Sequence, residues 1–158
     1  MLKVARSVME EISSQVVRGY PDECCGLLIG QAKGKVREAR VAFPATNLNR
    51  DRARDRYELD PVDFRRADET ARRTGADIIG IYHSHPDHPS RPSGFDQERA
   101  WEGYSYLILR VTGKGVDGYR SWELDDGSFR EEPLEILESA PGEPRSAGGA
   151  PGSGQSRR

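Results

Sequence analysis

The chain has 158 residues, and its 24 Lys and Arg against 26 Asp and Glu give a formal net charge of −2. This length fits a single domain that buries enough surface to fold without disulfides. A nucleic-acid-binding module is not expected, because binding to phosphates depends on a clear excess of Lys and Arg. No signal-peptide pattern occurs, and no apolar stretch approaches the roughly 20 residues of a membrane span. We therefore expect a cytoplasmic protein with neither nucleic acid nor membrane as a partner.

The first predicted element is an amphipathic helix over residues 4–18. Apolar residues recur there at a four-residue step from Val4 to Val16, and Pro21 follows as a stop signal. The short apolar run 24–30 then predicts a buried strand. Cys24 and Cys25, the two cysteines of the chain, open this run. Since adjacent cysteines cannot tie distant segments together, we interpret them as buried thiols on a strand.

The middle of the chain carries clearer boundary signals. Residues 35–43 predict a second strand, and a polar, arginine-rich loop over residues 47–56 follows it. A second helix is marked at both ends, because Asp60 can cap it, Pro61 occupies its first position and Gly75 can close it.

The strand predicted over residues 77–82 leads the chain directly to His83. Ser93 looks like the start of a short helix, and residues 104–111 predict another buried strand. Further strands are expected at 118–124 and 129–137, the latter at a sheet edge because it contains Pro133. Residues 138–158 hold no large apolar side chain, so we predict a disordered tail there and assign residues 1–137 to the folded domain.

All three histidines of the chain lie in the segment 83–88. Side chains two residues apart in an extended segment point the same way, so His83 and His85 can reach one ion while Ser84 faces elsewhere. Two imidazoles on one face make half of a zinc site. A third ligand must come from another residue, and the residue types leave three candidates: Asp87, His88 and Asp96.

Taken with Asp87 and His88, the segment reads H-x-H-x-D-H, which opens the dinuclear zinc site of metallo-β-lactamase-fold hydrolases. That site needs further histidines downstream, and no histidine follows His88. Amidohydrolase sites and PHP-type phosphoesterase sites also use HxH, and they fail for the same shortage of ligands.

Taken with Asp96, the segment matches the H-[ST]-H-x7-S-x2-D motif of the JAMM (MPN+) metallopeptidases, with Ser93 as its serine. The family also has a glutamate just before an apolar strand, and "YPDECCGLLIG" offers Glu23 in that setting. The chain therefore resembles this family over roughly residues 1–137. The resemblance implies an α/β fold of the α+β type, a single JAMM/MPN domain with a cytidine-deaminase-like mixed β-sheet flanked by helices.

The resemblance also implies a role for each motif residue. One Zn²⁺ per chain would be held by His83, His85 and Asp96, leaving a fourth position open for catalysis. Glu23 would be the general base and Ser93 a hydrogen-bond donor to the oxyanion. Ser93 and Asp96 also fit a helix-capping pair, which does not exclude these roles. His88 is interpreted as an exposed loop histidine.

The two motif stretches are most similar to those of small prokaryotic members resembling the CysO-cysteine peptidase. This implies a zinc-dependent peptidase that hydrolyses a peptide or isopeptide bond at the C-terminus of a ubiquitin-like or sulfur-carrier (β-grasp) protein. We expect loops 47–56 and 85–93 to border the groove for the carrier tail, and the tail to pair with a sheet edge near residues 77–82. The alternatives are a deubiquitinase-like isopeptidase of protein conjugates, a non-catalytic MPN scaffold and a hydrolase of a non-protein substrate. A homo-oligomer is compatible with the sequence.

Overall fold

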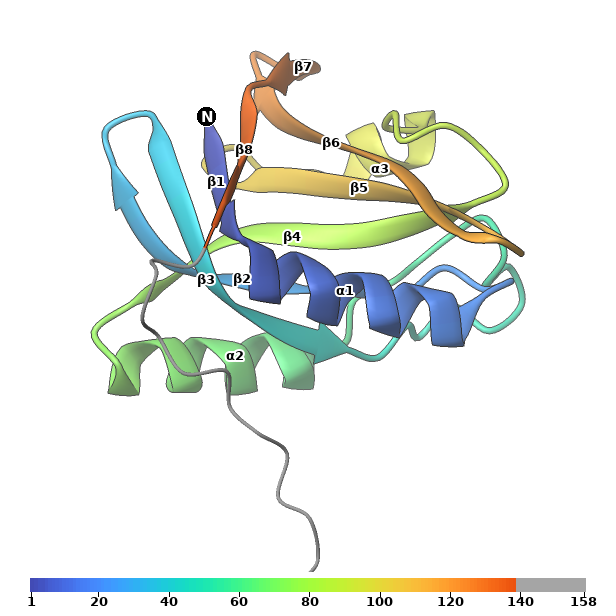
Figure 1. Cartoon of the computed structure of the whole chain (residues 1–158), viewed down its shortest axis with the longest axis horizontal. Helices are drawn as coiled ribbons and strands as arrows, with labels where there is room; N and C mark the ends of the chain where they lie inside the picture. The colour runs from blue at the N-terminus through green and yellow to red at the C-terminus, as the bar shows by residue number, and fades with distance from the viewer. Residues whose placement is uncertain (139–158) are drawn as a thin grey trace, which may run out of the picture.

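The computed structural model describes residues 1–138 and combines one large mixed sheet with three helices (Figure 1). In chain order the elements are β1 (Leu2–Ala5), α1 (Arg6–Gly19), β2 (Cys25–Lys33), β3 (Val36–Ala45), α2 (Pro61–Arg73), β4 (Asp77–Pro86), α3 (Gly94–Arg99), β5 (Ser105–Thr112), β6 (Gly115–Asp125), β7 (Ser128–Glu132) and β8 (Leu134–Leu137). This mixed α+β architecture confirms the expected fold class.

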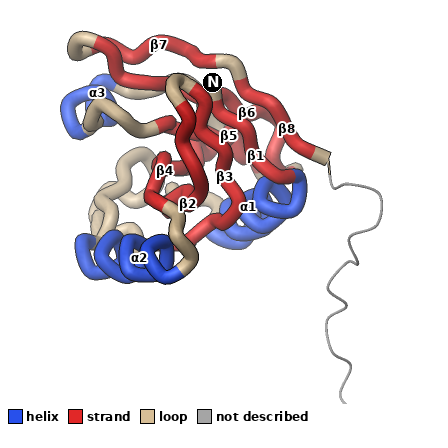
Figure 2. Tube along the Cα trace, turned by 90° about the vertical axis from the view of Figure 1, so that its left-hand side faces the viewer, coloured by secondary structure: helices blue, strands red, loops and turns tan. Residues whose placement is uncertain are grey.

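The sheet has eight strands in the order β7-β6-β5-β4-β2-β3-β1-β8. β4 lies in the middle, antiparallel to β2 and parallel to β5. β7 and β8 follow each other in the chain, separated by Pro133, yet they form the two opposite edges. The sheet must therefore curl back toward itself, and Figure 2 shows this curvature with β7 running on into β8.

α1 and α2 cover opposite faces of the sheet. Val8, Ile12 and Val16 of α1 pack in one apolar cluster with Tyr82 of β4. Ala67 and Ala71 of α2 pack in a second cluster that contains Ile81, the neighbour of Tyr82. Consecutive strand residues point to opposite faces.

The same alternation determines the face on which the histidine side chains of β4 lie. His83 and His85 continue from Ile81 at two-residue steps, so their side chains lie on the α2 face. Ser84 points to the other face, where its hydroxyl accepts a hydrogen bond from Cys24 N at 2.9 Å. The expectation that Ser84 faces away from the two histidines is confirmed.

The structure confirms the predicted boundaries of α2. Asp60 Oδ1 accepts a hydrogen bond from Val62 N at 2.8 Å, and Pro61 stands in the first turn. Gly75 has a φ of 68°, a left-handed conformation that glycine adopts at little cost, which fits its place just past the helix end.

The start of the first helix was predicted wrongly. Leu2–Ala5 form β1, which pairs in parallel with both β3 and β8, and α1 begins only at Arg6. Val4 is fully buried as a strand residue rather than as the first position of a helical stripe. Its strand partner Ile136 lies more than 130 residues away in the chain, so no local pattern indicates the pairing.

The expected edge for a carrier tail near residues 77–82 is also wrong. Tyr82 pairs with Gly26 of β2 on one side and with Leu107 of β5 on the other. A peptide strand cannot add to a strand whose two neighbours are already present. The long-range order of the sheet, which the sequence does not contain locally, places β4 at its centre.

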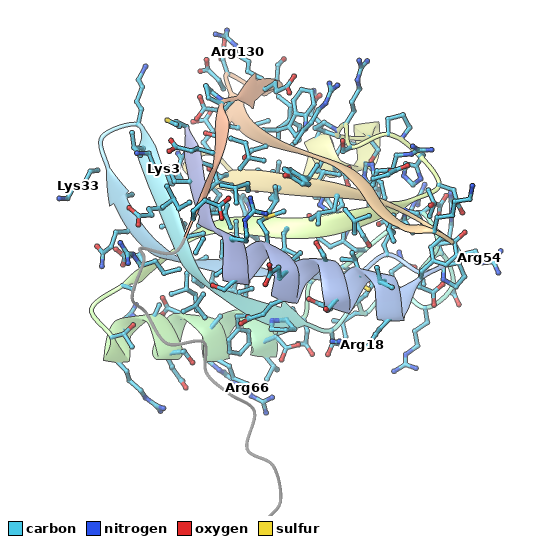
Figure 3. All side chains as sticks on the ribbon, in the orientation of Figure 1. Lys3, Arg18, Lys33, Arg54, Arg66 and Arg130 are labelled. Carbon is cyan, nitrogen blue, oxygen red and sulfur yellow. The ribbon has the colours of Figure 1, made fainter. Side chains whose placement is uncertain are left out.

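The predicted tail falls almost wholly outside the described residues, which end at Glu138. Glu138 itself makes an ion pair with Arg6. Within residues 1–138, no helix is both long and apolar enough to cross a membrane. In Figure 3, Lys33 lies at the left edge of the molecule, Arg54 at the right, Arg66 at the bottom and Arg130 at the top, so these labelled basic side chains do not gather in one place.

Candidate functional site

Three side chains from two segments converge at the end of β4. His83 Nε2 and His85 Nε2 lie 3.1 Å apart, and Asp96 Oδ2 of α3 lies 3.3 and 3.2 Å from them. A tetrahedral zinc ion with bonds of about 2.0–2.1 Å has ligand atoms roughly 3.3–3.4 Å apart. These residues therefore fit a zinc ion with little rearrangement, and all three are buried.

The start of α3 holds Asp96 in place. Ser93 Oγ accepts a hydrogen bond from Asp96 N at 3.0 Å, and Asp96 Oδ2 accepts one from Ser93 N at 2.8 Å. This reciprocal capping box is the local interaction expected from the sequence. The oxygen that caps the helix is the same oxygen that faces the two histidines. The cap therefore orients the carboxylate before any ion is bound.

The protonation states of this cluster suit a cation. Burial opposes ionisation of Asp96, but hydrogen bonds and charge from His83 and His85, with the Ser93 N–H, hold the pKa of that carboxyl well below its usual range. Burial lowers the pKa of His83, although Asp96 partly offsets this effect. A charged carboxylate beside a neutral imidazole is the state in which these groups bind metals.

The second ring nitrogen of each histidine has a different environment. His85 Nδ1 lies 2.7 Å from the carbonyl oxygen of Pro89, which can only accept, so Nδ1 carries the proton and Nε2 presents its lone pair to the site. His83 is held instead by the ring of Tyr57, stacked with a centroid distance of 4.5 Å. His83 Nδ1 has no hydrogen-bond partner among the described residues.

Glu23 reaches the same site from the turn before β2. Its side chain is buried, and Oε1 lies 3.9 Å from His85 Nε2. Oε2 is buried without a hydrogen-bond partner among the described residues. Burial, followed by the negative charges of Asp96 and Asp55, raises the pKa of Glu23 to about 9. A buried carboxyl with a free oxygen and a strongly shifted pKa is typical of a functional group rather than of a solvated turn residue.

Asn47 fixes the turn that carries Glu23. Its Nδ2 donates to the carbonyl oxygens of Glu23 and Arg56, at 3.1 and 3.0 Å, and its Oδ1 accepts from the backbone N–H groups of Asn49 and Glu58. The backbone N–H of Glu23 donates to Ala53 O. The loop over residues 47–56 therefore positions Glu23, a role that its arginine-rich composition did not indicate.

His88 was misjudged as an exposed loop residue. Its ring stacks on that of His85 with a centroid distance of 4.2 Å, its side chain is 38% exposed, and its Nε2 lies 4.0 Å from Glu23 Oε1. Asp87, in contrast, is exposed and accepts a hydrogen bond from the Tyr20 hydroxyl, so it does not join the ligand cluster. Of the three candidates for a third ligand, Asp96 alone lies within 3.3 Å of both histidine nitrogens among the described residues.

A groove of about 750 Å³ opens beside Asp96 on the α2 face. Its walls come from the segment before α2, from α2, from α3 and the residues after it, and from β4 and β5. They include the aromatic side chains of Tyr57, Phe64, Phe95, Trp101 and Tyr106. No residue of loops 47–56 or 85–93 lines this cavity. That these loops border the groove for the carrier tail stays a prediction. Loop 47–56 contacts the backbone of Glu23, through Asn47 and Ala53.

The two cysteines are free thiols, and neither reaches the cluster of histidines and acids. Cys25 is buried at the start of β2, as expected, while Cys24 is half-buried just before it. Burial raises the pKa of Cys25 to about 12, which makes it a poor nucleophile.

Comparison with known proteins gives several similar sequences. The chain is 36% identical over 135 residues to the desampylase of Haloferax volcanii, covering 82% of this chain and 92% of that protein. It is 32% identical over 127 residues to a probable TtuB-protein conjugate cleaving protease of Thermus thermophilus, covering 80% and 78%. The CysO-cysteine peptidase of Mycobacterium tuberculosis is 27% identical over 139 residues, covering 87% and 92%.

Structural similarity agrees with the sequence matches. A solution structure of a protein from Desulfitobacterium hafniense has a TM-score of 0.79 at 28% identity and covers 89% of this chain and 96% of that one. The family model described as prokaryotic homologs of the JAB domain matches residues 5–125, which is most of the chain. The resemblance to JAMM/MPN proteins is thereby confirmed, and the chain belongs to the family of prokaryotic homologs of the JAB domain.

Proposed function

We propose that this protein is a zinc-dependent metallopeptidase that hydrolyses a peptide or isopeptide bond at the C-terminus of a ubiquitin-like β-grasp carrier. The observation that carries the proposal is the triangle of His83, His85 and Asp96, with separations of 3.1–3.3 Å, beside the buried carboxyl of Glu23. Three protein ligands with an open side are typical of catalytic zinc sites, whereas structural sites use four.

The chain's own residues supply the remaining chemistry. When bound to these ligands, zinc lowers the pKa of a water molecule toward neutrality and, as a nearby cation, favours the ionised form of Glu23. The Glu23 carboxylate then accepts the proton of the attacking water and delivers it to the leaving amine. Its free Oε2 gives it room for both transfers, because no hydrogen bond within the described residues has to be broken.

The proposed role of Ser93 is to stabilise the carbonyl oxygen of the scissile bond. A hydroxyl has one donor and two acceptor positions. In the capping box Ser93 Oγ acts as an acceptor, toward Asp96 N, so its proton stays available for the oxyanion. One donor of this kind contributes about 10²–10³ in rate. The helix cap therefore uses a lone pair of the Ser93 hydroxyl, whereas the proposed catalytic role uses its proton.

The groove beside Asp96 supports a protein tail as substrate. Most of its lining is aromatic or aliphatic, with the charged side chains of Glu58, Glu98 and Arg99 among them, and it includes Asp96 of the ligand triangle. A groove of this kind receives an extended segment better than a folded surface. The relatives named a desampylase, a TtuB-protein conjugate cleaving protease and a CysO-cysteine peptidase all act, by their names, on conjugates or adducts of carrier proteins. We infer the same substrate class here, with the catalytic domain spanning residues 1–137.

The test is direct cleavage followed by intact mass measurement. Zinc-loaded wild type and Glu23→Gln are incubated with β-grasp carriers extended by a short peptide or joined to a lysine. We expect wild type to convert the adducts to free carrier, and Glu23→Gln to keep its zinc but lose about 10²–10⁴ in rate. Glu11→Gln, which removes an exposed carboxylate from α1 on the opposite face of the sheet, should cleave like wild type.

Two outcomes would overturn this proposal. If the zinc-loaded wild type left every carrier adduct intact, the substrate class would be wrong. If Glu23→Gln cleaved at a rate near that of wild type, Glu23 would not be the general base.

A further inference from the structure

The side chains of Glu23 and His88 form a second group of cation ligands next to the proposed zinc site. Glu23 Oε1 lies 4.0 Å from His88 Nε2 and 3.9 Å from His85 Nε2. His85 Nε2 already faces His83 and Asp96 in the first site, whereas His88 Nε2 does not. His88 is therefore free to bind a separate ion together with Glu23.

His88 is held in the tautomer that binds metals. Its Nδ1 lies 2.7 Å from the carbonyl oxygen of Pro86, which accepts a hydrogen bond and so fixes the proton on Nδ1. Nε2 is then left with a lone pair, 4.0 Å from Glu23 Oε1. A backbone carbonyl that fixes one nitrogen in this way is the usual second partner of a metal-binding histidine.

The backbone before His88 is built to hold this arrangement. Asp87 has a φ of 59°, a left-handed conformation that is uncommon outside glycine but that Asp and Asn adopt more readily than other residues. The hydrogen bond from the Tyr20 hydroxyl to Asp87 Oδ2, 2.7 Å long, stabilises the turn from the end of α1. The turn brings the His88 ring back onto His85, where it stacks at 4.2 Å.

The environment of Glu23 also indicates an absent partner. Its side chain is 2% exposed, and its Oε2 has no hydrogen-bond partner among the described residues. Buried polar atoms normally have a partner, which can be a bound ion. The side chain of His88 is 38% exposed, so zinc in solution has access to this pair.

We propose that Glu23 and His88 bind a second zinc ion, which inhibits the enzyme when zinc exceeds one equivalent per chain. The inference rests on the proposed function, because the first ion and the role of Glu23 belong to it. The two ligand atoms lie 4.0 Å apart, so the half-exposed His88 ring has to move toward Glu23 by about 0.6–0.7 Å to reach the roughly 3.3–3.4 Å separation of a tetrahedral zinc site. A Glu23 carboxylate bound to zinc cannot accept a proton from water, so turnover stops. With two protein ligands, the second ion binds more weakly than the first.

The test is zinc binding measured by calorimetry on protein that already contains one zinc, without substrate. His88→Phe keeps an aromatic ring to stack on His85 but has no nitrogen, and it should weaken the second binding event by at least about tenfold. Glu23→Gln should retain the first zinc and lose the second. Cys24→Ser is the control, because it removes a half-buried thiol that could otherwise bind excess zinc, and it should keep both events.

The cleavage rate provides a second readout. For each variant, the rate in excess zinc is compared with the rate of the same variant at one equivalent of zinc. Excess zinc should slow wild type and leave the rate of His88→Phe unchanged relative to its own rate at one equivalent. The proposal is overturned if wild type binds only one zinc, or if His88→Phe binds the second as tightly as wild type. Since the calorimetry uses no carrier, a failure to cleave carriers would contradict the proposed function and leave the second site standing.

Discussion

At the scale of single residues, the site combines two acids in opposite states. Asp96 is kept ionised by two histidines and a helix cap, while burial raises the pKa of Glu23 so that it stays protonated in the absence of a cation. Environments that push two carboxyl pKa values apart are how proteins assign different roles to the same functional group. This difference suits the proposed roles of Asp96 as a metal ligand and Glu23 as a general base.

The raised pKa of Glu23 makes the stability of the metal-free protein depend on pH. The folded state holds the Glu23 proton up to a pKa of about 9, whereas the unfolded chain releases it near the ordinary value of 4.5. Between these values the unfolded state binds fewer protons, so stability falls as pH rises. We expect the free energy of unfolding of wild type, relative to that of Glu23→Gln, to drop by a few kcal/mol across this window.

Urea unfolding of both metal-free proteins at several pH values measures this difference. Glu23→Gln serves as the reference, because its side-chain amide cannot ionise and every other group titrates in both proteins. A difference between the two proteins that stays constant from about pH 5 to about pH 9 would contradict the assignment of a protonated, buried Glu23.

The sequence indicated the residues of the proposed zinc site because their spacing is local. His83 and His85 are two residues apart in one strand, and Ser93 and Asp96 form a cap within one helical turn. His88 escaped prediction because its direction depends on the left-handed turn at Asp87, stabilised by Tyr20 from 67 residues away. A contact between residues so far apart in the chain produces no pattern in the sequence around His88.

At the scale of elements, a bulge in β4 decides which face the histidines occupy. Leu28 pairs with Gly80 and Ile29 with Ile78, so Ile79 is an extra residue in the ladder. Ile79 packs on the α1 face, whereas Ile81, two residues on, packs on the α2 face. A bulge reverses the alternation of a strand, and without it His83 and His85 would point away from α3. The apolar run 77–82 predicts the strand but not this bulge.

The close pairing of β2 and β3 requires glycine at position 30. A Cβ atom there would lie 1.8 Å from the backbone oxygen of Glu38. Gly30→Ala must therefore displace backbone, and we expect it to lower the free energy of unfolding by about 1–3 kcal/mol or more. Gly113→Ala is the matched control, because no atom lies within 4 Å of a Cβ at that position, and it should change stability by less than about 0.5 kcal/mol. Equal stability of the two variants in chemical denaturation would show that β3 does not approach β2 this closely.

At the scale of the whole molecule, the curled sheet brings the parts of the site together. β4 supplies the histidines from the centre of the sheet, the turn before β2 supplies Glu23 from the neighbouring strand, and α3 supplies Asp96 on the α2 face. Helices and buried strands were largely predictable from capping residues and apolar runs. The strand order, β1 and the position of the groove were not, because they depend on pairings between segments distant in the chain.

The central claim is that one zinc ion, held by His83, His85 and Asp96, makes this fold a peptidase. It is tested most directly by adding zinc stepwise to metal-free protein while measuring the rate of carrier-adduct cleavage. We expect almost no cleavage without zinc, a rate that rises in proportion to zinc and a maximum at one equivalent per chain. Metal-free protein that already cleaves at its full rate, or a rate that keeps rising well beyond one equivalent, would contradict it.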